Sequence, residues 1–112
     1  DPIGANLRDA HMANANLKNA ILVDSYLMGA DLAGTNLANT KLAGVDLEGA
    51  SLRDANLTAA DLKDANMEGV DLEGANLSSA NLEGADLGYT RIKGAIFCNT
   101  TMPDGSVIYS GC

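Results

Sequence analysis

The chain has 112 residues, which is enough for one compact domain and too few for two ordinary ones. Its 15 acidic and 7 basic residues give a formal net charge of −8, and this balance argues against direct binding to the phosphate backbone of nucleic acids. Three Tyr, one Phe and no Trp exclude a core built around large rings, and no apolar run approaches the roughly 20 residues that span a bilayer. The first residue is Asp1 rather than Met, which indicates a removed presequence or a trimmed chain.

A five-residue repeat runs through almost the whole chain. Every fifth position from residue 7 to residue 102 is apolar, and fifteen of these twenty positions are Leu. The residue two places earlier is always Ala, Ser, Thr or Val, and the residue just before the apolar one is Asn or Asp in twelve of the twenty repeats. The residue two places after it is mostly Gly, Asp or Asn. The repeats follow one another without insertion between Ala5 and Asp104.

A period of five fits neither a helix nor a continuous strand. On a helix it would spread the Leu side chains over every face, and on a flat strand it would send alternate Leu to opposite sides. Short extended segments joined by corners remove the conflict, because the small residue and the Leu then both point inward while their neighbours point outward. The fifth position must turn the chain, which suits Gly, Asn and Asp. A coil of such segments closes most simply as a square.

Units such as ADLAG at residues 30–34 and ANLSS at residues 75–79 resemble the pentapeptide repeat family. The resemblance implies an all-β fold, a right-handed quadrilateral β-helix, which is a solenoid with four pentapeptide units per coil. Twenty units then make about five coils. We therefore expect a repeat domain over residues 1–104, with its first units near Ala5, and a C-terminal cap over residues 105–112.

Four bulky apolar residues near the N-terminal end occupy outward positions. With four units per coil, Ile21 and Val23 lie on the last side of the first coil, and Tyr26 and Met28 lie on the first side of the second, so all four surround one corner. We interpret them as a candidate contact patch, covered by an N-terminal element missing from the chain or by a protein partner. The alternative is an ordinary scatter of apolar side chains. Residues 1–4 are too few to cover the first coil.

Residues twenty apart should stack, so the surface divides into four faces. We name them face one to face four; they begin with residues 5–9, 10–14, 15–19 and 20–24 and continue every twenty residues. Face one has five acids and one base, face four has five acids and two bases, and face two has four acids and three bases. Face three has Lys18 as its one charge. We interpret this neutral face as a candidate contact surface or as a ladder of amides hydrogen-bonded to each other, and its column consists of Asn16, Asn36, Asn56 and Asn76.

The repeat fades after Met102 into the sequence Pro-Asp-Gly at residues 103–105, a strong turn signal. Residues 106–109 then form a short apolar stretch that suits folding over the last coil. Cys98 and Cys112 bracket this stretch, and we predict that a disulfide between them holds the cap in place; two unrelated thiols are the alternative. A closed loop of about 15 residues is worth roughly 3 kcal/mol in the chain-entropy model. Such a pair favours an oxidising compartment.

No catalytic, metal-binding or cofactor-binding motif is recognisable. The one histidine, His11, lies at an outward position without a nucleophile arranged beside it, and two Cys and one His are too few for a metal site. The glycines mark corners and form neither a phosphate loop nor a dinucleotide-binding fingerprint. We therefore predict no enzyme activity, no metal and no cofactor.

The sequence favours a non-catalytic scaffold or protein-interaction module of undefined biochemical role. The stretch from Phe97 to Ser106, with Cys112 after it, resembles the C-terminal ends of the small pentapeptide repeat proteins of the thylakoid lumen in plants and cyanobacteria. This resemblance implies a lumenal protein whose presequence has been removed. We expect an unknown protein partner, no direct binding of nucleic acid, no membrane insertion and a monomer, with association end to end or through the N-terminal end as the alternative.

A second interpretation belongs to a different class of function. Some members of the family are acidic rods that mimic duplex DNA and bind a type II topoisomerase such as gyrase, and a net charge of −8 is compatible with that role. Against it, the rod is short, bases interrupt two of its acidic faces, and its tail offers no obvious equivalent of the elements through which those relatives dimerise.

Overall fold

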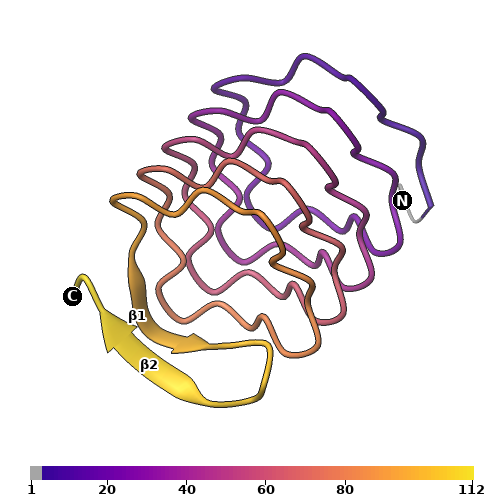
Figure 1. The fold of residues 1–112 in the computed structure, drawn as a ribbon. Helices are drawn as coiled ribbons and strands as arrows, with labels where there is room; N and C mark the ends of the chain where they lie inside the picture. Colours follow the sequence, from indigo (N-terminus) through magenta and orange to yellow (C-terminus); the bar gives the residue numbers. More distant parts are fainter. Residues whose placement is uncertain (1–3) are drawn as a thin grey trace.

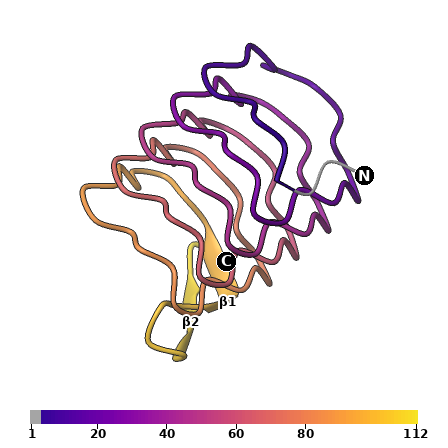
Figure 2. The same cartoon turned by 90° about the vertical axis from the view of Figure 1, so that its right-hand side faces the viewer.

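The computed structural model describes residues 4–112, so the first three residues of the expected repeat domain lie outside the described residues. The chain winds into a stack of similar coils, with the N-terminal coil at one end and a two-stranded hairpin at the other (Figure 1). A view turned by 90° shows the same stacking from the side (Figure 2). Isolated β-bridges join neighbouring coils, always in parallel and always between residues twenty apart, as in Asn16 to Asn36. Four repeats therefore complete one turn of the β-helix.

Each repeat consists of one bridged residue and a tight turn. The turn closes when the N–H of the next small residue donates to the carbonyl of the Leu, as Ala60 does to Leu57 at 3.0 Å. The fifth residue of every repeat from residue 4 to residue 99 has φ between +57° and +73°, a left-handed conformation. The expectation that Gly, Asn and Asp turn the chain there is confirmed at most corners, and the exceptions are Ala59, Ser79 and Tyr89.

The corners stack in columns in which an Asp or Asn often lies above a glycine. The side-chain oxygen of Asp54 lies where a Cβ on Gly74 would have to sit, and Asn14 has the same relation to Gly34. Gly74 and Gly34 have φ of +73° and +68°. A glycine is therefore required twice at these corners, by the left-handed backbone and by the close approach of the coil before it.

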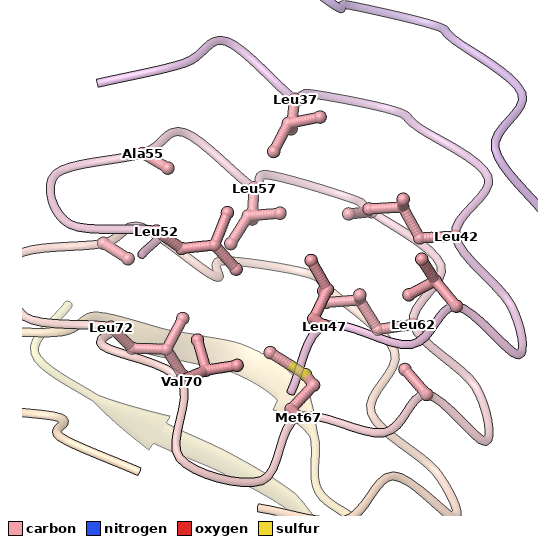
Figure 3. Close-up of a cluster of buried hydrophobic side chains, with 14 of the residues drawn as sticks. Leu37, Leu42, Leu47, Leu52, Ala55, Leu57, Leu62, Met67, Val70 and Leu72 are labelled. Carbon is pink, nitrogen blue, oxygen red and sulfur yellow. The ribbon is translucent and has the colours of Figure 1, made fainter. Parts of the chain in front are cut away.

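The interior is one apolar column of Leu and small residues. The Leu side chains of the middle coils are at most 1% exposed, and Leu37 and Leu57 point into this interior in Figure 3. The small position also accepts Thr, because the hydroxyls of Thr35 and Thr40 donate to the carbonyls of Leu32 and Leu37 at 2.7 and 2.8 Å. Full burial of one Leu side chain contributes about 1.5–3 kcal/mol, so this column is the main source of stability.

Backbone hydrogen bonds join each coil to both of its neighbours. The N–H of Leu57 donates to the carbonyl of Asn76 in the next coil at 2.7 Å, and the N–H of Asn56 donates to the carbonyl of Thr35 in the preceding coil at 2.9 Å. A central coil therefore needs two neighbours to satisfy its backbone. The first and last coils each have an edge like that of an open sheet.

Two strands form an antiparallel hairpin at the C-terminal end. Strand β1 (Phe97–Thr101) is part of the last coil, and strand β2 (Val107–Ser110) pairs with its outer edge. The register places Phe97 opposite Ser110 and Thr101 opposite Val107. On its inner edge, Thr101 bridges to Asn81 of the coil above. The boundary expected at residue 104 lies inside the turn between β1 and β2.

The tail is held by a disulfide, by its turn and by one apolar contact. Cys98 and Cys112 are bonded, with their Cα atoms 5.1 Å apart. The hydroxyl and the backbone N–H of Ser106 donate to Oδ1 of Asp104 at 2.6 and 2.9 Å, and these bonds lower the pKa of Asp104. Ile108 of β2 packs against the core. The hairpin thus closes the edge of β1.

Replacing Ala59 with Gly should stabilise the protein. Ala59 is an exposed corner residue with φ of 59°, where the Cβ of an L-residue costs about 1 kcal/mol or more. We expect Ala59→Gly to raise the free energy of unfolding in urea by about 0.5–1 kcal/mol. The matched reverse change, Gly49→Ala, should lower it, because Gly49 has φ of +69° and a Cβ added there would meet no atom within 4 Å. A loss of stability in Ala59→Gly would contradict a left-handed corner at this position.

Candidate interaction surfaces

The Asn column on face three is joined through its backbone rather than through its amides. Successive bridges link the four residues, and each Asn side-chain oxygen accepts the N–H two residues later in its own repeat, at 3.0–3.2 Å. Within residues 4–112 no hydrogen bond joins two of these side chains, so the amides hold their own turns instead of forming the ladder considered above. Their Nδ2 donors make no hydrogen bond within that range either. Face three as a contact surface stays a prediction.

Carboxylates crowd together on face one. Glu48 and Glu68 are one coil apart in the same column, and Asp86 follows in the next coil. A hydrogen bond with Glu48, together with burial and the nearby charge of Asp86, raises the pKa of Glu68. Asn66 relieves part of the repulsion, because its Nδ2 donates to Oδ1 of Asp46 at 3.3 Å. The Glu68 carboxyl group on face one therefore holds its proton more strongly than an isolated Glu does.

Opposite charges pair between coils on face two. Arg53 Nη1 lies 2.7 Å from Oε1 of Glu73, twenty residues later, and 3.4 Å from Oδ2 of Asp71. These neighbours raise the pKa of the Arg53 guanidinium, Glu73 most of all. Arg91 and Lys93 of the last coil are exposed and form no ion pair within residues 4–112. The C-terminal end of face two thus carries two cations without a local partner.

The predicted N-terminal patch is only partly apolar surface. Ile21 and Tyr26 are 40% and 44% exposed, whereas Val23 and Met28 are half-buried. The guanidinium carbon of Arg8 lies 5.2 Å from the ring centroid of Tyr26, a cation–π contact that places a charge over the ring. The patch as a contact site stays a prediction.

A second apolar area, which the sequence analysis missed, lies on the C-terminal end. Ile92 occupies the inward position of its repeat and is 52% exposed, whereas Leu72, one coil earlier, is fully buried. Residues 85–94 of the last coil have no strand beyond them, because β2 pairs with β1 alone. The signal in the sequence was Tyr89, an aromatic residue at a corner. The exposed apolar residues here are Tyr89, Ile92, Val107 and Tyr109.

The cavity inside the solenoid is lined by apolar side chains. A narrow cavity of about 30 Å³ follows the axis through the N-terminal coils, and every residue that lines it is Leu or Met. Among residues 4–112 no group of His, Cys, Asp and Glu is placed to hold a metal ion, and His11 is exposed. The same residues contain no helix that could cross a bilayer. The candidate functional sites are therefore the faces and the ends of the solenoid.

The coil of four repeats, the left-handed corners and the Leu column define a β-helical solenoid. The chain belongs to the pentapeptide repeat family. A family model described as a pentapeptide repeat region matches residues 5–77, and another, described as pentapeptide repeats (8 copies), matches residues 65–102. A comparison with curated proteins gave no match.

Several solved structures are similar to this chain. Rfr23, a pentapeptide repeat protein of the cyanobacterium Cyanothece 51142, is 39% identical with a TM-score of 0.76, over 89% of this chain and 64% of its own. QnrB1, a plasmid-mediated fluoroquinolone resistance protein, is 21% identical with a TM-score of 0.79, over 88% of this chain and 51% of its own, which shows the fold alone. AT2G44920, from the Arabidopsis thaliana thylakoid lumen, is 29% identical with a TM-score of 0.45, over 92% of this chain and 68% of its own. This chain spans less than two thirds of the length of Rfr23 and of QnrB1.

Replacing Glu68 with Gln should stabilise the protein at neutral pH and have little effect in acid. Because its pKa is raised, the folded protein holds the Glu68 proton more tightly than the unfolded chain does. The stability linked to this proton is therefore complete below the ordinary value of 4.5 and is lost as the pH rises through the folded pKa. Thermal unfolding of Glu68→Gln and of the parent at pH 7 and pH 4 measures the difference.

The matched control for this change is Glu83→Gln on face four. Glu83 lies one coil after Lys63 in its column, so loss of its charge removes an attraction and should not stabilise at pH 7. A gain for Glu68→Gln that is as large at pH 4 as at pH 7 would contradict the crowding of carboxylates on face one.

Proposed function

We propose that this chain is a non-catalytic scaffold, a right-handed quadrilateral rod of about five coils whose faces and ends bind other proteins. The supporting observation is the division of each repeat into inward and outward positions. The inward positions are filled by apolar or small residues that are buried in the middle coils, so they are available for packing alone. The outward positions vary from repeat to repeat and can carry recognition without disturbing the core. In this proposal residues 1–104 are the repeat domain and residues 105–112 the disulfide-tied cap.

In this proposal the main contact surface for a protein partner is face three. It is supported by the near absence of charge and by the Nδ2 donors of its Asn column, which are available to acceptors on a partner. The patch of Ile21, Val23, Tyr26 and Met28 is a second candidate. A flat face whose one charge is Lys18 suits a protein partner, because little desolvation of charge accompanies its burial.

We further propose that the protein works in the thylakoid lumen. The disulfide between Cys98 and Cys112 supports an oxidising compartment, since such bonds persist there and are rare in reducing ones. The resemblance of the stretch from Phe97 to Ser106 to the ends of lumenal pentapeptide repeat proteins supports the same assignment.

A DNA-mimicking ligand of a type II topoisomerase is the second candidate. The observation that favours it is the carboxylate column of face one, formed by residues from successive coils: Asp46, Glu48, Glu68 and Asp86. Against it stand the cations of face two and the pairing of Arg53 with two acids, which lower the negative charge of the neighbouring face. A continuous acidic surface is what mimicry of a duplex requires.

Counting free thiols distinguishes these two candidates. We expect both cysteines to be blocked when protein from its native source is denatured, alkylated and weighed by mass spectrometry, because an oxidising lumen keeps the Cys98–Cys112 bond. Two free thiols would contradict the lumenal proposal. Inhibition of gyrase supercoiling at micromolar protein would then support the topoisomerase ligand, and no inhibition is expected if the scaffold proposal holds.

Charges introduced on face three should weaken partner binding without disturbing the fold. Asn36→Asp and Asn56→Asp keep the oxygen that accepts the N–H of the turn, as Asp31 and Asp61 already do in equivalent positions. We expect the double variant to lose at least tenfold in affinity for proteins retained from lumenal extract by the parent, because two charges would be buried unpaired. Asn81→Asp on acidic face four is the matched control. Unchanged binding by the double variant would refute face three as the contact surface.

A further inference from the structure

We propose that the open part of the last coil, residues 85–94, binds an extended strand of another protein. The strand carries apolar residues five positions apart, a basic residue after the first of them, and acidic residues on both sides of the second. This inference deepens the scaffold function proposed above and rests on it, because it names one kind of partner and the site that receives it.

The outer edge of residues 85–94, where a further coil would pair, presents six unused backbone hydrogen-bonding groups in a fixed register. They have no partner within residues 4–112, whereas the equivalent groups one coil earlier are all paired. Leu72 N–H, for example, donates to the Arg91 carbonyl at 2.7 Å, and Arg91 N–H donates to the Val70 carbonyl at 3.1 Å. A strand placed one layer beyond the last coil would repeat this pattern and add to the edge as another coil does. The unused groups are the N–H of Leu87, Tyr89, Ile92 and Gly94 and the carbonyls of Ala85 and Thr90.

The apolar residues of the strand would complete the core at this end. Leu87 is half-buried and Ile92 is 52% exposed. Their counterparts one coil earlier, Met67 and Leu72, are 0% exposed because the last coil covers them. A strand with apolar residues five apart would place one over Leu87 and one over Ile92. This requirement fixes both the spacing and the register of the partner.

The charges of face two select acids in the second half of the strand. Arg53 and Glu73 occupy one column and approach to 2.7 Å, so opposite charges one coil apart can reach each other here. Lys93 is the next residue in that column, and Arg91 follows Asp71 in the neighbouring one. An acidic residue after the second apolar position of the strand would lie next to Lys93, in the column of Arg53 and Glu73. An acidic residue before that position would lie next to Arg91, in the column of Asp71.

The charges of face one select a base in the first half of the strand. The column of Glu48 and Glu68 continues to Gly88, and Asp86 lies beside it. A Lys or Arg after the first apolar residue of the strand would stand next in this column, close to carboxylates that form no ion pair within residues 4–112. The order of basic first and acidic second gives the strand one orientation.

A strained aromatic residue marks the corner between these two segments. Tyr89 has φ of 59° and is 89% exposed, although a bulky residue in this conformation is a genuine outlier that costs about 1–3 kcal/mol. At other corners the side chain lies over the corner of the following coil, as Asp54 does over Gly74. The ring of Tyr89 would therefore lie over the corner of a bound strand. Its exposed surface would then be buried against the backbone of that strand.

A second copy of this chain suits the site less well. Strand β2 lies along the outer edge of β1 and fills the next layer beside the open segment, as Figure 1 shows at the yellow end of the chain. A complete first coil from another copy would meet β2. Two copies of net charge −8 also repel each other. A single strand two repeats long avoids both conflicts.

The test uses the full chain labelled with ¹⁵N and a synthetic decapeptide, Ala-Asn-Leu-Lys-Gly-Ala-Asp-Leu-Glu-Gly. We expect the amide signals of Leu87, Tyr89, Ile92 and Gly94 to shift on titration to about 1 mM peptide, and binding to be lost when the Asn and Asp nitrogens of the peptide are methylated. A control peptide with its Lys and Glu exchanged should bind about two- to fivefold more weakly. Absence of these shifts, or equal binding of the methylated peptide, would overturn the proposal.

Two exposed substitutions in the protein sharpen the test. Lys93→Glu should remove most of the preference between the two peptides, because the column of Arg53 and Glu73 would then favour a base, as the face-one column already does. Tyr89→Asn should weaken peptide binding while raising stability, since Asn tolerates the left-handed corner better than Tyr does. If the peptide fails to bind but the Asn36 and Asn56 variants still lose their partners, the strand site is refuted and the scaffold function stands. A preference that stays undiminished in Lys93→Glu would refute the charge selection.

Discussion

The whole structure depends on a left-handed corner at every fifth residue. Each corner turns the chain by a quarter of a coil, and four corners return it to a position directly beyond its starting point, so residues twenty apart come together. The hydrogen bonds between coils and the apolar column both follow from this return. For an ordinary L-residue the left-handed conformation costs about 1–2 kcal/mol, and twenty such corners would exceed the stability of a small domain. Gly, Asn and Asp keep that sum small enough for the core to outweigh it.

The same constraint separates stability from recognition. Leu and the small residues are directed to the axis and carry the packing energy, while the two remaining positions of each segment face solvent. The outward residues therefore form columns along the rod: carboxylates on face one, alternating charges on face two and neutral Asn residues on face three. Face two lies between the other two. Because each column is an independent choice of outward residues, binding properties can differ between faces of one rod.

The ends behave differently from the middle because a coil needs two neighbours. The C-terminal hairpin resolves this for one part of the last coil, where β2 covers β1 and Ile108 packs on the core. It leaves residues 85–94 with free backbone groups and a half-exposed core. The last coil is therefore closed on one side and open on the other, and the open side is where we propose that a partner strand binds.

Much of this could be predicted from the sequence, because the repeat determines the fold almost alone. The inward Leu, the corner glycines and the stacking of residues twenty apart follow from the period and from the residue types. The details that could not be predicted depend on distances between coils. The Asn side chains of face three accept hydrogen bonds within their own turns. Arg53 forms ion pairs with two acids of the next coil. Because the hairpin does not extend over residues 85–94, Ile92 is left exposed. Periodicity gives no information on which of several nearby partners a side chain takes.

Amide hydrogen exchange, measured residue by residue on the full chain, tests most directly that coils satisfy one another and leave one edge open. The N–H groups of Leu57 and Asn56, which bond to coils on either side, should exchange slowly and together with global unfolding. The N–H groups of Leu87 and Ile92 should exchange at nearly the rate of an unstructured peptide. Protection of Leu87 and Ile92 equal to that of Leu57 would contradict an open edge, and fast exchange at Leu57 would contradict the stacked coils themselves.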